Sequence, residues 1–145
     1  MNKKILVAGL GNVFAGDSGF GPAVTFALRE RTWPNGVEII DFAGHNRDLA
    51  AAMAKGLDAV ILVDTVARGG APGTLYVLEP EPGTTVLELA STLGETPRYV
   101  RLVGCEPGMR PAPDEIAHGL SAAVEAAVGP ATKLVAQLVR EVQCV

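Results

Sequence analysis

Short runs of Val, Ile and Leu alternate along this chain with alanine-rich stretches of helical character. The apolar runs predict five strands, near residues 3–9, 36–41, 58–64, 73–78 and 99–104. The alanine-rich stretches predict helices near residues 19–32, 46–55, 84–93 and 120–141. This alternation is typical of an α/β layer architecture.

Two of the apolar runs, Ile5 to Leu10 and Ala59 to Val63, contain no charged residue. Such runs are expected of central strands that helices cover on both faces, so we predict that these two strands are neighbours. The loop from Arg68 to Gly73 is too short to hold a crossover helix. It therefore predicts that the strands before and after it form an antiparallel pair, which makes the sheet mixed.

Composition and charge indicate a single globular domain and argue against a nucleic-acid-binding or membrane-spanning protein. The chain has 145 residues, of which 48% are hydrophobic and 19% charged, as expected for one domain, residues 1–145, with a single core. A net charge of -4 without a Lys/Arg run argues against nucleic-acid binding. No uninterrupted apolar run approaches the ~18 residues of a membrane span. Two widely separated cysteines, Cys105 and Cys144, fit a reduced compartment and predict a cytoplasmic protein.

Two carboxylates follow predicted central strands. Asp17 comes after the glycine-rich turn that ends the first strand, and Asp64 ends the third strand. The carboxyl ends of parallel strands open into one crevice, where ligands bind in open α/β sheets, so both acids are candidate site residues. The alternatives are local: Asp64 can cap its own turn, and Asp17 can be the N-cap of the following helix.

Other candidate residues carry weaker signals. Gly9-x-Gly11 opens a dinucleotide-binding fingerprint, but Phe14 stands where its third glycine belongs. His45, in the loop after the second strand, is a candidate ligand or proton carrier. Cys105 fits a small buried hydrophobe.

The two candidate nucleophiles lack supporting motifs. Neither Ser18 nor Ser121 lies in a nucleophile elbow, and Ser121 fits the start of the last helix instead. The sequence therefore identifies no catalytic residue.

Several spaced motifs follow one another in a fixed order: Gly9-Leu-Gly11-Asn12, Gly16-Asp17-x-Gly19-x-Gly21, Val63-Asp64 and Ala71-Pro72-Gly73-Thr74. This set resembles the hydrogenase maturation proteases over nearly the whole chain. The resemblance implies a three-layer αβα sandwich around a twisted, mostly parallel five-stranded sheet with one antiparallel strand. It also implies an endopeptidase that removes the C-terminal peptide of a nickel-iron hydrogenase large-subunit precursor and recognises the nickel that the precursor carries.

The resemblance further implies a ligand set of two carboxylates and one histidine. Asp64 matches one carboxylate, whereas Ser18 stands where the other is expected, with Asp17 beside it. The family histidine would fall in the segment Glu79 to Thr85, which is shortened here and contains none. Asp17 and Asp64 are therefore the candidate nickel ligands, and His45 is a possible substitute.

Two alternative functions stay open. Serine cannot replace the charge of a carboxylate, so the chain can instead be a catalytically degenerate member that binds or assembles a hydrogenase subunit. A nucleotide-binding α/β domain is the third choice. For the peptidase we expect a monomer that uses no organic cofactor and does not associate with membranes.

Overall fold

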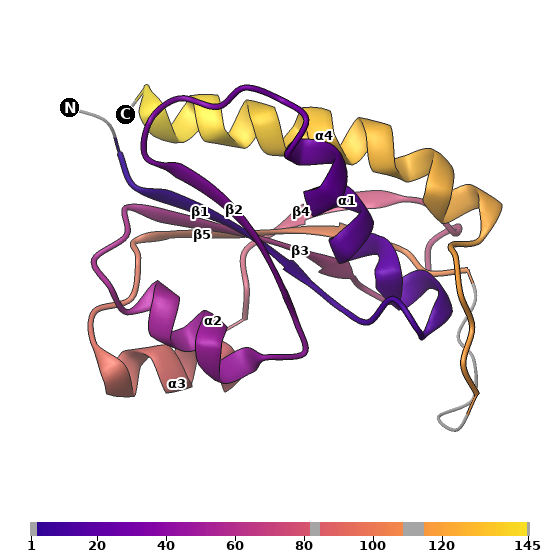
Figure 1. The fold of residues 1–145 in the computed structure, drawn as a ribbon, viewed down its shortest axis with the longest axis horizontal. Coiled ribbons are helices and arrows are strands. Elements are labelled where there is room, and N and C mark those ends of the chain that lie inside the picture. The colour runs from indigo at the N-terminus through magenta and orange to yellow at the C-terminus, as the bar shows by residue number, and fades with distance from the viewer. Residues whose placement is uncertain (1–2, 82–84, 109–114, 145) are drawn as a thin grey trace.

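The computed structural model describes residues 3–81, 85–108 and 115–144, and in it five strands form one sheet in the order β2-β1-β3-β5-β4. The strands are β1 (Ile5–Leu10), β2 (Val37–Ala43), β3 (Ala59–Thr65), β4 (Leu75–Leu78) and β5 (Tyr99–Cys105). The helices are the 3-10 helix η1 (Gly16–Gly19), α1 (Phe20–Leu28), α2 (Asn46–Met53), α3 (Thr85–Leu93) and α4 (Ala122–Gln143). Helices α1 and α4 cover one face of the sheet and α2 and α3 the other (Figure 1), which confirms the three-layer sandwich.

The sheet is mostly parallel, as predicted. β1 lies between β2 and β3 and is parallel to both, β3 is parallel to β5, and β4 is antiparallel to β5. The prediction that β1 and β3 are neighbours is confirmed.

The predicted pairing of β3 with β4 is wrong, because β5 lies between them. The connecting loop crosses the end of β5: the amide of Val66 donates to the carbonyl oxygen of Cys105 at 2.9 Å, and that of Gly73 to the carbonyl oxygen of Glu106 at 2.9 Å. The length of the loop therefore predicted the direction of β4 correctly, but it did not predict that β5 is the strand next to β4.

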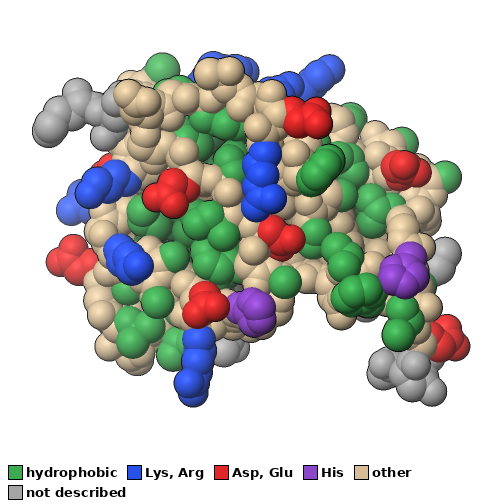
Figure 2. Space-filling model, in the orientation of Figure 1, with side chains coloured by type: hydrophobic (Ala, Val, Ile, Leu, Met, Phe, Trp, Pro, Cys, Tyr) green, Lys and Arg blue, Asp and Glu red, His purple; other side chains and the backbone are tan. Residues whose placement is uncertain are grey.

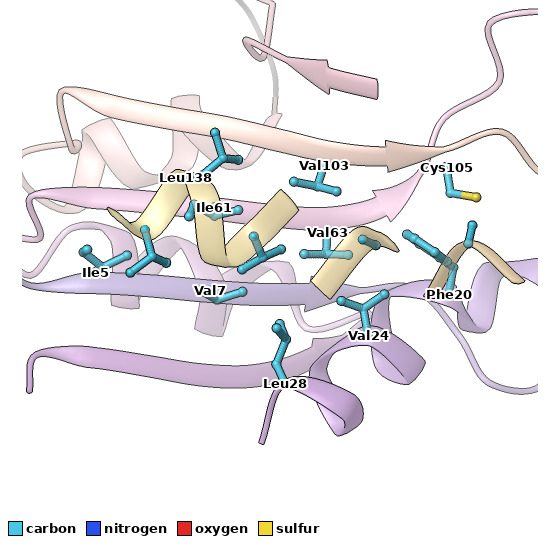
Figure 3. Packing of buried hydrophobic residues seen from close by; sticks show 14 of the residues in the cluster. Ile5, Val7, Phe20, Val24, Leu28, Ile61, Val63, Val103, Cys105 and Leu138 are labelled. Atoms are coloured by element: carbon cyan, nitrogen blue, oxygen red, sulfur yellow. The ribbon is translucent and has the colours of Figure 1, made fainter. Parts of the chain in front are cut away.

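Side chains of the central strands alternate between two cores. On one face, strand residues such as Val7, Ile61 and Val63 share one core with Phe20 and Val24 of α1 and Leu138 of α4 (Figure 3). The intervening strand residues pack against α2 and α3. Burial on both faces explains why β1 and the Ala59–Val63 part of β3 are apolar.

Helix α4 is a core helix. Its length and composition alone would allow it to cross a membrane. Residues spaced three or four apart are buried, however, and they pack in the core that this face of the sheet shares with α1; they include Val124, Ala131, Val135, Leu138 and Val142. An amphipathic stripe of this kind is what a sheet-covering helix requires.

Candidate functional site

The candidate site lies where β1, β3 and β5 end. η1 follows the turn that leaves β1 and leads into α1, and Gly21 in the first turn of α1 packs directly on the strand ends. A Cβ atom at Gly21 would lie 2.7 Å from the carbonyl oxygen of Val63 and would collide with the carbonyl oxygen of Leu10. Only glycine allows this approach, so Gly21 lets the first turn of α1 lie tightly against the end of the sheet.

Ser18, at the expected carboxylate position, closes the turn after β1. The amide of Asn12 donates to both the carbonyl oxygen and Oγ of Ser18, each at 3.1 Å. Gly11 has a φ of 118°, and a Cβ there would collide with the carbonyl oxygen of Ser18. In a dinucleotide-binding turn, the pyrophosphate lies close to the backbone of the glycine-rich turn. Here the backbone of Ser18 occupies the space against Gly11, which argues against the nucleotide-binding alternative.

Asp64 is the next-to-last residue of β3, lies opposite Gly104 of β5 and is half-buried. The amide of Thr65 donates to Oδ1 of Asp64 at 2.8 Å, and no other described residue donates to this carboxylate or forms an ion pair with it. Burial raises the pKa of Asp64 above its ordinary value, and the Thr65 hydrogen bond offsets only part of that rise. A half-buried carboxylate with one uncommitted oxygen is stabilised when a cation reaches it.

Asp17 joins three segments that are distant in sequence. The side chain is 0% exposed, and it accepts hydrogen bonds from the amide of Gly108 (2.7 Å), the amide of Ser121 (2.7 Å) and the hydroxyl of Ser121 (2.8 Å). It therefore holds η1 to the segment after β5 and to the start of α4. A cation could reach Asp17 only by displacing one of these donors, and a metal-binding role for Asp17 stays a prediction.

The helix boundaries near Asp17 differ in one respect from expectation. The N-cap of α1 is Gly19, which excludes the alternative in which Asp17 caps this helix. Ser121 is the N-cap residue of α4, as predicted, but its hydroxyl donates to Asp17 instead of capping its own helix. Asp17 supplies the negative charge at this helix N-terminus, where the helix dipole favours it.

Glu106 is a second anchor, which the sequence analysis missed. It is 5% exposed, and its Oε1 accepts hydrogen bonds from the amides of Arg68 (2.9 Å) and Gly70 (3.0 Å) and from the hydroxyl of Tyr76 (2.8 Å). The Arg68 amide leads the contacts that lower the pKa of Glu106. A Cβ at Gly70 would collide with the Tyr76 hydroxyl, so the glycine lets the loop approach these partners of Glu106. Glu106 fixes the loop that follows Asp64.

The remaining candidates lie apart from these contacts or are inert. His45 is exposed at the N-terminus of α2 and makes no capping hydrogen bond. Cys105 is fully buried, and burial raises the pKa of its thiol to about 11, so it is the small buried hydrophobe that was predicted.

The donor set for a resident metal is incomplete. Among the residues that the structure describes, no three His, Cys, Asp or Glu side chains gather closely enough to hold an ion. The segment Glu79 to Thr85, where the family histidine would fall, includes residues 82–84, which lie outside the described part of the chain.

Known proteins share both the sequence and the fold. The chain is 33% identical to hydrogenase 2 maturation protease of Escherichia coli, over 95% of this chain and 92% of that protein. The structure of the hydrogenase maturating endopeptidase HybD from E. coli matches with 32% identity and a TM-score of 0.76, over 95% of this chain and 93% of that one. A hydrogenase 2 maturation peptidase from Thaumarchaeota archaeon SCGC_AB-539-E09 matches with 30% identity and a TM-score of 0.70, over 94% and 97% of the two chains. No protein-family model matches the chain.

Proposed function

This chain belongs to the hydrogenase maturation protease family, and on that premise we propose that it is the endopeptidase that removes the C-terminal peptide of a nickel-iron hydrogenase large-subunit precursor. Sequence similarity over nearly the full length of both proteins supports this activity. The observation on this chain that carries the proposal is the half-buried carboxylate of Asp64, which accepts one hydrogen bond from the described residues and has a raised pKa.

We propose that Asp64 contacts the nickel ion that the precursor brings with it. Oxygen ligands suit nickel, and the uncommitted oxygen of Asp64 lies at the edge of the sheet where substrates of α/β enzymes bind. Because the described residues form no three-ligand cluster, the other ligands in this proposal come from the substrate. The contact would then align the precursor's C-terminal segment, which is catalysis by positioning.

Three other side chains are secondary candidates for the same ion. Ser18 is neutral and its Oγ already accepts a hydrogen bond, so it would add little to affinity. Asp17 would have to release Gly108 or Ser121 first. His45 is exposed and would have to approach from the start of α2.

The test is a cleavage assay with intact, nickel-loaded precursor, read by mass spectrometry. The wild-type chain is expected to release a short C-terminal peptide, and Asp64→Asn to release none. Asp58→Asn is the matched control, because Asp58 also accepts one backbone amide, from Lys4, but lies at the opposite end of β3. An uncleaved precursor with the wild-type chain, or full cleavage with Asp64→Asn, would contradict the proposal.

A second candidate function is a non-catalytic one, in which the chain binds or helps to assemble a hydrogenase subunit. The neutral side chain of Ser18, at the position where the family carries a carboxylate, favours it. The same assay distinguishes the two functions, because this one predicts a stable complex with precursor of unchanged mass. For either function we expect a monomer that acts in the cytoplasm without an organic cofactor.

A further inference from the structure

A groove runs beside the candidate site, on the outer side of η1. It has a volume of about 400 Å³, which lies within the range of small-ligand clefts. Val13, Phe26 and Leu120 are among the apolar residues that line it. Gly19 lies between two of them: a Cβ there would lie 3.4 Å from Val13 and 3.6 Å from Leu120. Gly16 and Gly19, the ends of η1, also line the groove. The turn that carries Ser18 is therefore a wall of both the groove and the site.

The surface around the groove is unusually apolar. In the groove, Phe26 is 69% exposed and Val13 is 48% exposed. Phe14, which follows Val13 in the chain, is 54% exposed. Ile116, which precedes the Ala117 that bridges to Ala15, is 72% exposed. Only Val77 and Leu93 are comparably exposed large hydrophobic residues elsewhere in the described part of the chain. Figure 2 shows hydrophobic side chains gathered over the face that α1 occupies in Figure 1. Clustered exposure of this kind marks an interaction surface.

Two charged residues complete the lining. Arg29, just after α1, forms no ion pair with any residue that the structure describes. Asp41, near the end of β2, accepts a hydrogen bond from the amide of Ala43 at 2.9 Å and stands too far from Arg29 to form a salt bridge with it. A free guanidinium next to apolar walls is complementary to a chain end, because it binds a carboxylate through paired hydrogen bonds. The carboxylate of Asp41 is complementary to the backbone N–H groups of the same segment.

We propose that this groove binds the C-terminal end of the precursor, with the terminal carboxylate on Arg29 and apolar side chains against Val13 and Phe26. The proposal rests on the proposed peptidase function, because the segment that this function removes from the precursor ends in that precursor's C-terminal carboxylate. Gly16 and Gly19 of η1 line the groove, and η1 also contacts β3, the strand that carries Asp64, so the groove and the site lie on two sides of the same short helix.

The test measures peptide binding by fluorescence anisotropy with the intact protein. The probe is fluorescein-labelled Gly-Ser-Gly-Val-Leu-Val, prepared as the free acid and as the C-terminal amide. The free acid is expected to bind about tenfold more tightly than the amide, as for the loss of one charged hydrogen-bonded contact. Arg29→Gln should abolish this difference, whereas Arg31→Gln, an exposed arginine outside the groove, should retain it. Phe26→Ser should weaken the binding of both peptides, whereas Val77→Ser should leave the binding of both unchanged.

Each opposite outcome overturns the proposal. Equal binding of acid and amide, or an undiminished difference in Arg29→Gln, would show that the groove does not recognise a chain end. Sedimentation that reveals a dimer in the wild-type chain and a monomer in Phe26→Ser would assign the groove to a second copy of the chain. The cleavage assay is independent of these results: a wild-type chain that binds the acid selectively but cleaves no precursor would refute the peptidase function and leave the groove assignment intact.

Discussion

Asp17→Asn tests whether a buried charge holds the end of the sheet together. The substitution preserves the shape of the side chain but replaces one acceptor oxygen by an NH₂ group that faces an N–H or O–H donor. Hydrogen bonds to charged groups contribute about 1.5–3 kcal/mol each and neutral ones about 0.5–1.5 kcal/mol, so the variant loses one bond and weakens those that it keeps. Relief of the cost of burying a charge offsets part of this loss.

We therefore expect Asp17→Asn to lower the free energy of unfolding by about 2–4 kcal/mol, and the Tm by roughly 5–15 °C. Urea titration, followed by far-UV circular dichroism and by the fluorescence of Trp33, the one tryptophan, measures the change. Trp33 reports on the core because it packs against the cluster beneath α1 and α4.

Two further variants show whether the loss comes from these particular contacts. Asp58→Asn removes the charge of an aspartate that accepts one exposed backbone hydrogen bond, and it is expected to cost less than about 1 kcal/mol. Ser121→Ala removes only the hydroxyl donor of Asp17, and its effect should shrink when Asp17 is already Asn. Strict additivity of the two changes, or a loss in Asp17→Asn no larger than that in Asp58→Asn, would refute the reasoning.

Three other predictions follow from the strand ends. Because the pKa of Asp64 is raised in the folded state, the folded chain keeps a proton that the unfolded chain has released, and stability falls as the pH rises from the ordinary aspartate pKa through the raised one. Asp64→Asn removes that loss, so thermal melts at neutral pH should show a higher Tm in a variant that no longer cleaves precursor; an unchanged or lower Tm would contradict this. A thiol reagent such as DTNB should modify exposed Cys144 at once and buried Cys105 only on unfolding, and rapid modification of both in the native protein would show that Cys105 is accessible. Gly21→Ala forces a Cβ onto the carbonyl oxygen of Leu10 and should cost at least about 2 kcal/mol in urea titration, more than Ala substitution at Gly44, which has open space around it.

Local patterns in the sequence were sufficient for most of the fold. The apolar runs of β1 and β3 predicted their place at the centre of the sheet because burial on both faces leaves no room for polar residues. The loop after β3 predicted that the next strand runs antiparallel, but a loop's length does not state which strand lies beside it. β5, which comes later in the chain, takes the place next to β3.

The candidate site was harder to predict, since its contacts join residues far apart in sequence. Asp17 was identified as a site residue from its position after β1, but its partners lie 91 and 104 residues away, and no local pattern reveals them. Glu106 was missed for the same reason, because its donors lie 36 and 38 residues earlier in the chain. Both carboxylates are single residues without a motif, so only the folded chain shows what they bind.

The long reach of Asp17 also sets an order of assembly. During synthesis the strand β1, the turn and η1 emerge early, while Gly108 and Ser121 follow 91 and 104 residues after Asp17. At roughly 5–20 residues per second this delay is about 5–20 s. Until then the carboxylate of Asp17 has no partner from α4, and burying it would leave a charge uncompensated. The nascent chain can pair its central strands, but its ligand-facing edge closes only when the last helix arrives, so an incompletely translated chain does not present a finished site to a precursor.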